Sequence, residues 1–217
     1  AVNVGAGELV VYLNNEGGFL SLKGAVSAGA LTKNGLRELQ MNNASNAISG
    51  PVSIWGGTLN VTGGNGPGPQ SSVMIGGLGT WTVGTSLSVT GLGGVGTLSI
   101  SSGKTNFVTG ILSAGQATAS LTATSGGTLS LGTNALASFD LDYINTPTGT
   151  PRLAMSGNVL NVASGASVTL NALANRPTGR YEKTFVLVQY GALTGSFRTK
   201  VNAPEGVEAQ LVYDDLN

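Results

Sequence analysis

Neither cysteine nor histidine occurs among the 217 residues of this chain. Without cysteine there can be no disulfide, no thiolate nucleophile and no thiolate metal site. Without histidine the chain lacks the side chain that most often transfers protons near neutral pH. These two absences remove the commonest means of enzymatic catalysis and argue against a zinc site.

Charge is also scarce. Lys, Arg, Asp and Glu make up 9% of the residues, against roughly a quarter in ordinary globular domains. Between Glu38 and Asp140 the only charged residue is Lys104. The net charge is zero, so no basic surface is expected that would attract nucleic acid or anionic lipid. No run of about 18 apolar residues is present, so no transmembrane helix is expected.

The chain is rich in glycine and contains a short sequence motif that recurs. Glycine contributes 35 of 217 residues, about 16%, against roughly 7% in average usage. Hydrophobic residues still reach 41%, which is enough to bury a core. A phrase of the type Gly-Thr-Leu-Ser-Ile occurs four times, at residues 57–61, 79–83, 96–100 and 127–131. Such self-similarity indicates a stacked-repeat architecture.

Apolar and polar residues alternate over short stretches, which is the pattern of half-buried strands. Helical periodicity is nearly absent, and glycine is too frequent for long helices. Pairs such as Gly-Gly and Asn-Gly favour turns between the stretches. The alternating apolar pairs are Leu59/Val61, Trp81/Val83, Leu87/Val89, Leu98/Ile100, Leu129/Leu131, Leu160/Val162 and Val168/Leu170.

The spacing of these stretches fits two all-β architectures. Strands that recur every 8 to 11 residues also suit a sandwich or a barrel. Those folds usually carry more charge and more aromatic residues than this chain, in which aromatic residues make up 6%. Short repeats with Thr, Ser and Asn at equivalent places favour a parallel β-helix with about 20 residues per coil. Like charges stacked at strand spacing would repel, which explains coils poor in charge.

Composition divides the chain into coils and a cap. We expect β-helix coils over residues 1–170, with a protruding loop near 64–69 that is rich in Gly and Pro. Over residues 171–217 charges return, and Phe185, Val186, Leu187 and Val188 form a continuous apolar run. The last coil of a solenoid must close its core and cover exposed backbone, so we interpret 171–217 as a C-terminal cap.

Asp140 and Asp142 are the candidate ligand-binding carboxylates. They lie two residues apart in one predicted strand, so both would project from the same face. Paired carboxylates on a β-helix could cleave polysaccharide or bind Ca²⁺. No third acid and no Lys or Arg cluster stands beside them, so a solvated strand face is the favoured interpretation. No catalytic residue, metal site or cofactor is predicted.

Two other features were weighed as ligand sites. Residues 91–96 match the G-x-G-x-x-G pattern of dinucleotide-binding loops, but that motif needs a following helix. Another predicted strand follows instead, so the match is rejected. Trp55 and Trp81 could stack on carbohydrate, although core packing is favoured for Trp81 because it alternates with Val83.

Four phrases stand in order over residues 30–61: Ala30-Leu31-Thr32-Lys33-Asn34-Gly35, Leu39-Gln40-Met41, Asn46-Ala47-Ile48-Ser49-Gly50 and Gly57-Thr58-Leu59-Asn60-Val61. Their order and spacing resemble the passenger-associated repeat of bacterial autotransporters. The chain departs from the repeat at Arg37-Glu38, where the family usually has a Gly, and at Ile48, where an aromatic residue is common. The resemblance implies a right-handed parallel β-helix.

The end of the chain is similar to the C-terminal passenger segment of the same family. There the capping region helps the β-helix to fold outside the cell and precedes an outer-membrane β-barrel. The resemblance makes the following residues candidates for the cap and folding nucleus: Tyr181, Phe185, Val186, Leu187, Val188, Gly195, Phe197 and Tyr213. The matched motifs are structural, so no catalytic residue is carried over.

These observations predict a structural stalk of a secreted, surface-displayed autotransporter passenger. It would be exported through the periplasm and outer membrane of a Gram-negative bacterium, with its own C-terminal barrel as a partner. It could adhere to a host surface or to another copy of itself. The alternatives are a β-helical polysaccharide-binding or depolymerising protein and a self-associating adhesin.

Overall fold

The computed structural model describes residues 1–14, 17–63, 66–116 and 118–213, and in these ranges the chain is all-β without a helix. The strands are β1 (Val2–Asn3), β2 (Glu8–Tyr12), β3 (Phe19–Leu22), β4 (Val26–Ala28), β5 (Ala30–Asn34), β6 (Glu38–Met41), β7 (Ala47–Ile48), β8 (Val52–Val61), β9 (Ser72–Val83), β10 (Leu87–Gly94), β11 (Thr97–Ile100), β12 (Thr105–Ala114), β13 (Leu121–Thr124), β14 (Thr128–Leu131), β15 (Leu136–Asp142), β16 (Leu153–Val162), β17 (Ser167–Ala174) and β18 (Val188–Gly195).

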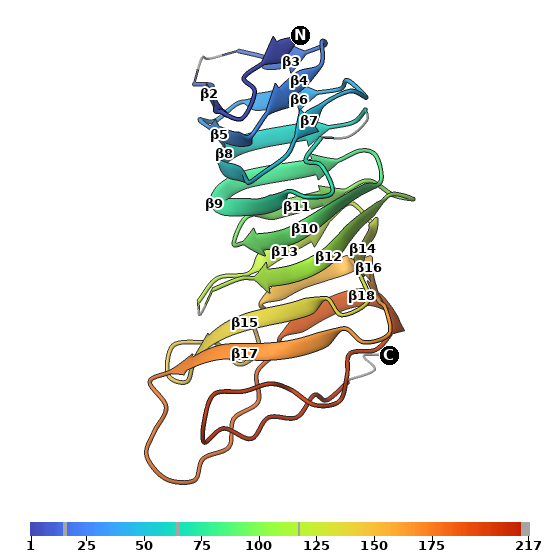
Figure 1. The fold of residues 1–217 in the computed structure, drawn as a ribbon. Helices are drawn as coiled ribbons and strands as arrows, with labels where there is room; N and C mark the ends of the chain where they lie inside the picture. Colours follow the sequence, from blue (N-terminus) through green and yellow to red (C-terminus); the bar gives the residue numbers. More distant parts are fainter. Residues whose placement is uncertain (15–16, 64–65, 117, 214–217) are drawn as a thin grey trace.

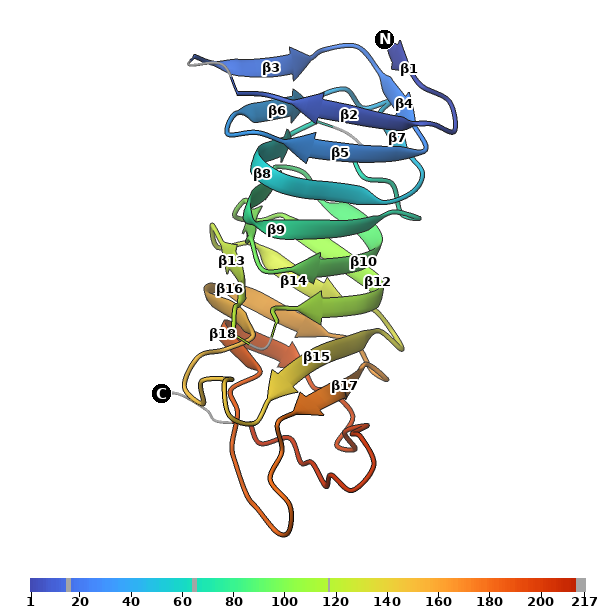
Figure 2. The same ribbon diagram turned by 90° about the vertical axis from the view of Figure 1, so that its left-hand side faces the viewer.

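The strands pair side by side in three stacks along the long axis of the molecule (Figure 1). The first stack contains β2, β5, β15 and β17 with parts of β8, β9, β10 and β12, and Figure 2 faces it. The second contains β3, β6, β11 and β13 with parts of β8, β9, β16 and β18. The third contains β1, β4, β7 and β14 with parts of β10, β12, β16 and β18.

All of these strand pairs are parallel. Long strands such as β8 and β9 bend from one stack into the next, so hydrogen bonds join fifteen strands into one sheet. The remaining strands, β1, β4 and β7, form a separate sheet of three.

The register in the first stack shows how many residues separate one strand of the stack from the next. We call each such strand, together with the chain that leads to the next one, a rung. Each partner in this row lies 19 to 22 residues after the one before it, close to the predicted interval of about 20. The row runs Leu9, Leu31, Val52, Val73, Leu92 and Leu112. From Leu112 to its partner Ala137 and then to Val168 the interval grows, because longer segments enter after β12 and β15.

The core lies between the stacks and is built from the inward residues of each strand. The predicted alternation is confirmed, since Leu59, Val61, Val83, Leu98 and Ile100 are all fully buried. Trp81 is also fully buried and stands in register between Leu59 and Leu98. Apolar residues of consecutive rungs therefore cover one another along the axis.

Glycine is required at the corner where β10 turns towards β11. Gly94 has a φ of 115°, a conformation that other L residues rarely adopt. A Cβ at this position would collide with the backbone carbonyl of Ile75 on the rung before. Close stacking of backbones thus explains part of the high glycine content.

The predicted loop at 64–69 differs from the expectation. Residues 64–65 lie outside the described residues. Gly66 and Pro67 are buried, and Pro67 forms a parallel bridge with Ile48. This part of the segment therefore continues the third stack instead of protruding.

The C-terminal segment lies across the last rungs (Figure 1). The segment begins with the end of β17 and contains β18, and its Asn202 forms a bridge with Thr169. Lys200 and Gln210 form an antiparallel bridge within the segment. Residues 214–217 of the predicted cap lie outside the described residues.

Candidate functional site

The two candidate carboxylates occupy different environments. Asp140 is exposed, whereas Asp142, at the end of β15, is only 8% exposed. The register between β15 and β17 shifts between Phe139 and Asp140. The prediction of a pair on one solvated face is therefore wrong for Asp142.

Asp142 holds the turn that follows β15. Its Oδ1 accepts hydrogen bonds from the backbone N–H groups of Ile144 and Asn145, both at 2.9 Å. Its Oδ2 accepts hydrogen bonds from the side-chain amides of Asn145 at 2.9 Å and Asn175 at 2.6 Å. The backbone hydrogen bond from Asn145 is the main reason why the pKa of Asp142 is lowered. These donors occupy the carboxylate, so it joins the loops after β15 and β17.

The described residues offer little for metal or acid–base chemistry. Among them, no group of three or more His, Cys, Asp or Glu side chains could hold a metal ion. The motif at 91–96 ends β10 and leads into β11, so the helix that a dinucleotide would need is absent there. Trp55 is 51% exposed, while Trp81 is in the core as predicted.

The predicted cap residues lie in and around β18. Tyr181, Phe185, Val186 and Leu187 precede the strand, while Val188 and Gly195 are its first and last residues.

The side chains of some predicted cap residues contact Tyr143, which follows β15. The rings of Tyr143 and Tyr181 meet edge to face, with centroids 4.8 Å apart. Lys183 Nζ lies 4.8 Å from the ring centroid of Tyr143 and 4.9 Å from that of Phe185. The Tyr213 hydroxyl accepts a hydrogen bond from the Phe197 N–H at 2.9 Å.

Two buried cations were missed by sequence reasoning. Lys33 is fully buried in the inward row between Val11 and Ile54. Its Nζ donates to the carbonyls of Asn34 at 2.9 Å and of Gly35 and Gly56 at 3.0 Å. Burial lowers the pKa of this ammonium. The alternation of apolar and polar residues could have predicted the inward position of Lys33, because Lys33 follows the inward residue Leu31 by two positions.

Arg152 is the second buried cation and lies immediately before β16. It is fully buried, and its guanidinium donates to the carbonyls of Gln116 at 2.7 Å and Thr150 at 2.8 Å. Burial lowers the pKa of this group as well. Arg152 therefore holds together the segments that lengthen the rungs after β12 and β15.

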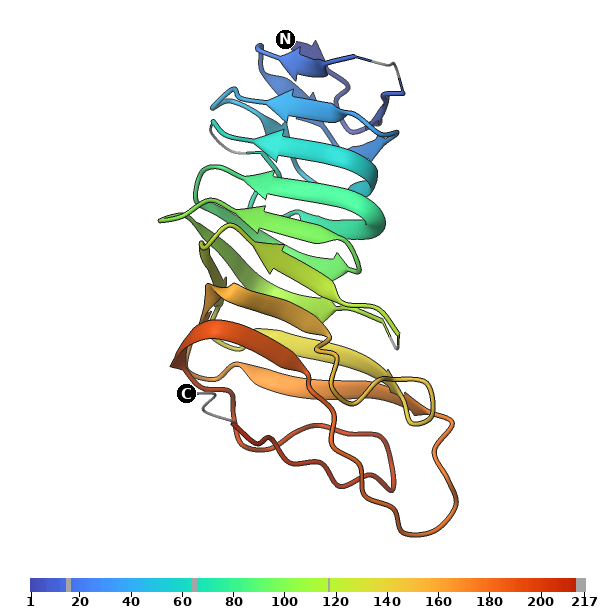
Figure 3. The same cartoon turned by 180° about the vertical axis from the view of Figure 1, so that it is seen from behind.

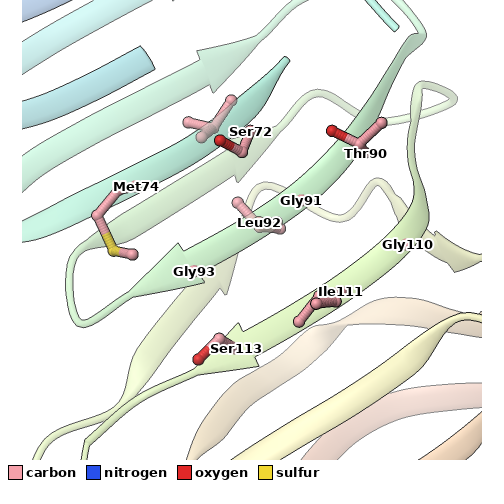
Figure 4. Close-up of a pocket in the computed structure, with 10 residues that line it drawn as sticks. Ser72, Met74, Thr90, Gly91, Leu92, Gly93, Gly110, Ile111 and Ser113 are labelled. Atoms are coloured by element: carbon pink, nitrogen blue, oxygen red, sulfur yellow. The ribbon is translucent and has the colours of Figure 1, made fainter. Parts of the chain in front are cut away.

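A notch in the outer face of the first stack contains hydroxyl groups that are free to bind a ligand. Its floor is β10, where the outward positions 91 and 93 are both glycine (Figure 4). Met74 of β9 and Ile111 of β12 stand on either side, 43% and 53% exposed. The hollow measures about 440 Å³ and also includes Ser72 and Ser113.

The notch can bind but has no groups for acid–base catalysis. None of its lining residues is charged. The Thr90 hydroxyl is engaged by the carbonyl of Ser71 at 2.9 Å. The hydroxyls of Ser72 and Ser113 make no hydrogen bond within the described part of the chain. Two hydroxyls between apolar walls suit a neutral ligand with both polar and apolar faces.

No family model, no curated protein and no solved structure matches the chain. Within the described ranges, none of the secondary structure is a helix of the length and apolarity needed to cross a membrane.

Proposed function

We propose that the chain is the structural stalk of a secreted autotransporter passenger, folded as a right-handed parallel β-helix with a C-terminal cap. The observation that carries the proposal is the succession of parallel rungs at intervals of 19 to 22 residues. The resemblance of residues 30–61 and 181–213 to that family supports it. Secretion, display at the surface of a Gram-negative bacterium and the outer-membrane barrel as partner belong to the same proposal.

The work of such a stalk lies in its folding and its length. Each rung buries its apolar residues only against its neighbours, so folding starts at one stable end and propagates. We assign the start to the cap, where Tyr181 and Phe185 meet Tyr143 and Lys183. Folding from the C-terminal end would then draw the remaining chain outwards during export.

Deletion of residues 171–217 tests the proposal. We expect the shortened chain to refold from denaturant more slowly and in lower yield than the full chain, measured by circular dichroism. Deletion of residues 1–46, which removes a similar length from the other end, is the control and should leave the refolding rate of the remainder nearly unchanged. Unchanged rate and yield after the C-terminal deletion would contradict the assignment of the cap as nucleus.

The notch favours a second candidate function, the binding of a neutral glycan. A sugar ring could lie on the half-buried backbone of Gly91, beside buried Gly93, and reach the hydroxyls of Ser72 and Ser113. Gly91→Leu would fill the notch, and we expect it to abolish glycan binding measured on a glycan array and by calorimetry. Ser53→Leu, on the same stack but outside the notch, is the matched control. Binding unaffected by Gly91→Leu would reject this candidate.

A further inference from the structure

The outer face of the second stack carries two rows of short polar side chains over four consecutive rungs. Figure 3 shows these rungs side by side, from cyan through green to olive, with no segment lying across them. One row is entirely threonine, and the other contains one asparagine, two threonines and one serine. We call this the threonine face: Thr58, Thr80, Thr97 and Thr122 in one row, and Asn60, Thr82, Ser99 and Thr124 in the other.

The register makes the threonine face a regular two-dimensional array. Neighbouring rungs of a sheet lie about 4.7–4.9 Å apart, and outward residues of one strand lie about 6.6 Å apart. Pairing is continuous between β9, β11 and β13, and the shift between β8 and β9 lies earlier, at Ile54 and Gly56. Each rung is fixed by a fully buried inward residue such as Trp81 or Leu98. The array is therefore periodic and held rigidly.

Six of the eight residues of this face have hydroxyl groups that are free to bind something outside the chain, whereas Ser99 is hydrogen-bonded to Ser125 and Asn60 donates to Glu38. Within the described part of the chain, the hydroxyls of six residues make no hydrogen bond to another protein group: Thr58, Thr80, Thr82, Thr97, Thr122 and Thr124. Elsewhere, threonines such as Thr90 and Thr109 donate to carbonyls of the rung before. None of the eight residues of the threonine face is charged.

The other two outer faces lack this regularity, which gives an internal comparison. The first stack presents Met74, two glycines and Ile111 in successive rungs. The third stack places Phe107, 43% exposed, beside Ser88 and Ser130. Among the residues that the structure describes, a two-row array of hydroxyls and methyl groups occurs on the second stack alone.

We propose that the threonine face binds ice. Along one axis, the oxygens of the flat planes of ice repeat at an interval close to the spacing of neighbouring rungs, so hydroxyls and ordered water between the methyl groups can continue the lattice in that direction. Water held between a surface and a ligand contributes nearly as well as a direct hydrogen bond. A rigid array loses little conformational entropy on binding, and a charged face would instead orient water around each charge. This inference goes beyond the stalk and can fail without affecting it.

Ice-affinity partition of the full chain is the experiment. We expect labelled protein to enter a slowly growing ice hemisphere and to inhibit ice recrystallisation, whereas Thr97→Lys loses both effects. Thr122→Lys, on a separate rung, repeats the test in case one variant folds poorly. Thr32→Lys on the first stack is the matched control, and we expect it to retain both effects. Circular dichroism melts establish that each variant is folded.

Two outcomes would overturn the proposal. One is exclusion of the folded wild-type chain from ice at the level of an unrelated protein. The other is an effect that persists in folded Thr97→Lys and Thr122→Lys. If sedimentation instead shows concentration-dependent association that Thr97→Lys abolishes, without any ice activity, the face pairs with a second copy and the ice proposal is wrong.

Discussion

The middle rungs and the C-terminal rung bury equivalent residues to different degrees. Leu129, Leu160 and Leu193 stand in one register row of the third stack. Leu129 and Leu160 are buried, whereas Leu193 in β18 is only partly buried. The N-terminal end behaves similarly, since Leu20 is 38% exposed while its register partner Leu39 is fully buried. The apolar side chains of a rung are therefore buried by the rungs on both sides, and their burial is incomplete in β3 and β18, which among the described residues pair with a strand on one side only.

The largest effect that tests this comparison is a core truncation in the middle. Trp81→Ala removes a fully buried side chain between two rungs, and we expect a loss of about 3–5 kcal/mol in the free energy of unfolding. Leu193→Ala at the last rung should lose less than about 2 kcal/mol, because that side chain is only partly buried. Chemical denaturation measures both variants. Equal losses would show that the ends are packed as tightly as the middle.

An intermediate effect is expected from the buried ammonium. Lys33→Met leaves the carbonyls of Asn34, Gly35 and Gly56 without their donor, and we expect a loss of about 1–3 kcal/mol in the free energy of unfolding. Lys104→Met replaces an exposed lysine and is the control, with an expected change within about 0.5 kcal/mol. An unchanged free energy of unfolding in Lys33→Met would mean that the cation does not stabilise the bend between the first and second stacks.

The smallest effect concerns Asp142 and the loops after β15 and β17, and it depends on pH. The folded-state pKa of Asp142 lies below its ordinary value of 3.8. The unfolded chain thus takes up a proton first, so the stability that this carboxylate adds is full above pH 3.8 and is lost as pH falls through the folded-state pKa.

Thermal melts of wild type and Asp142→Asn, from neutral pH to below pH 3.8, test whether the charge of Asp142 stabilises the folded chain. Asp142→Asn should be the less stable protein near neutral pH, and the difference should shrink in acid. Asp140→Asn, at an exposed position, should follow wild type closely. A difference between wild type and Asp142→Asn that does not vary with pH would contradict the role of the charge.

Alternation in the sequence was sufficient to predict the strands and much of the core. Leu59, Val61 and Trp81 follow it, because a strand with one face inward permits only one parity. The same parity places Lys33 inward, yet a lysine is rarely buried without a partner. Its partners are backbone carbonyls, including that of Gly56 on the next rung, and a sequence does not show where those meet.

The environment of Asp142 and the notch could not be predicted from the sequence, because both depend on contacts between segments that are distant in the chain. Asn175, which donates to Asp142, is 33 residues away, and the register between β15 and β17 shifts before these two residues, between Phe139 and Asp140. The notch exists because Met74, Gly93 and Ser113 stand in register on three rungs. Spacing predicted a coil of about 20 residues, but register at single-residue precision comes from the stacked structure.

The number of residues per rung determines how far the molecule lengthens when residues are inserted. One circuit of 19 to 22 residues advances the axis by a single strand spacing of about 4.8 Å. Duplication or loss of one circuit in the middle would join surfaces of the same kind, inward apolar residues against inward apolar residues. The reach of the molecule can therefore be lengthened or shortened in small, equal increments by changes in gene length, while both ends are kept.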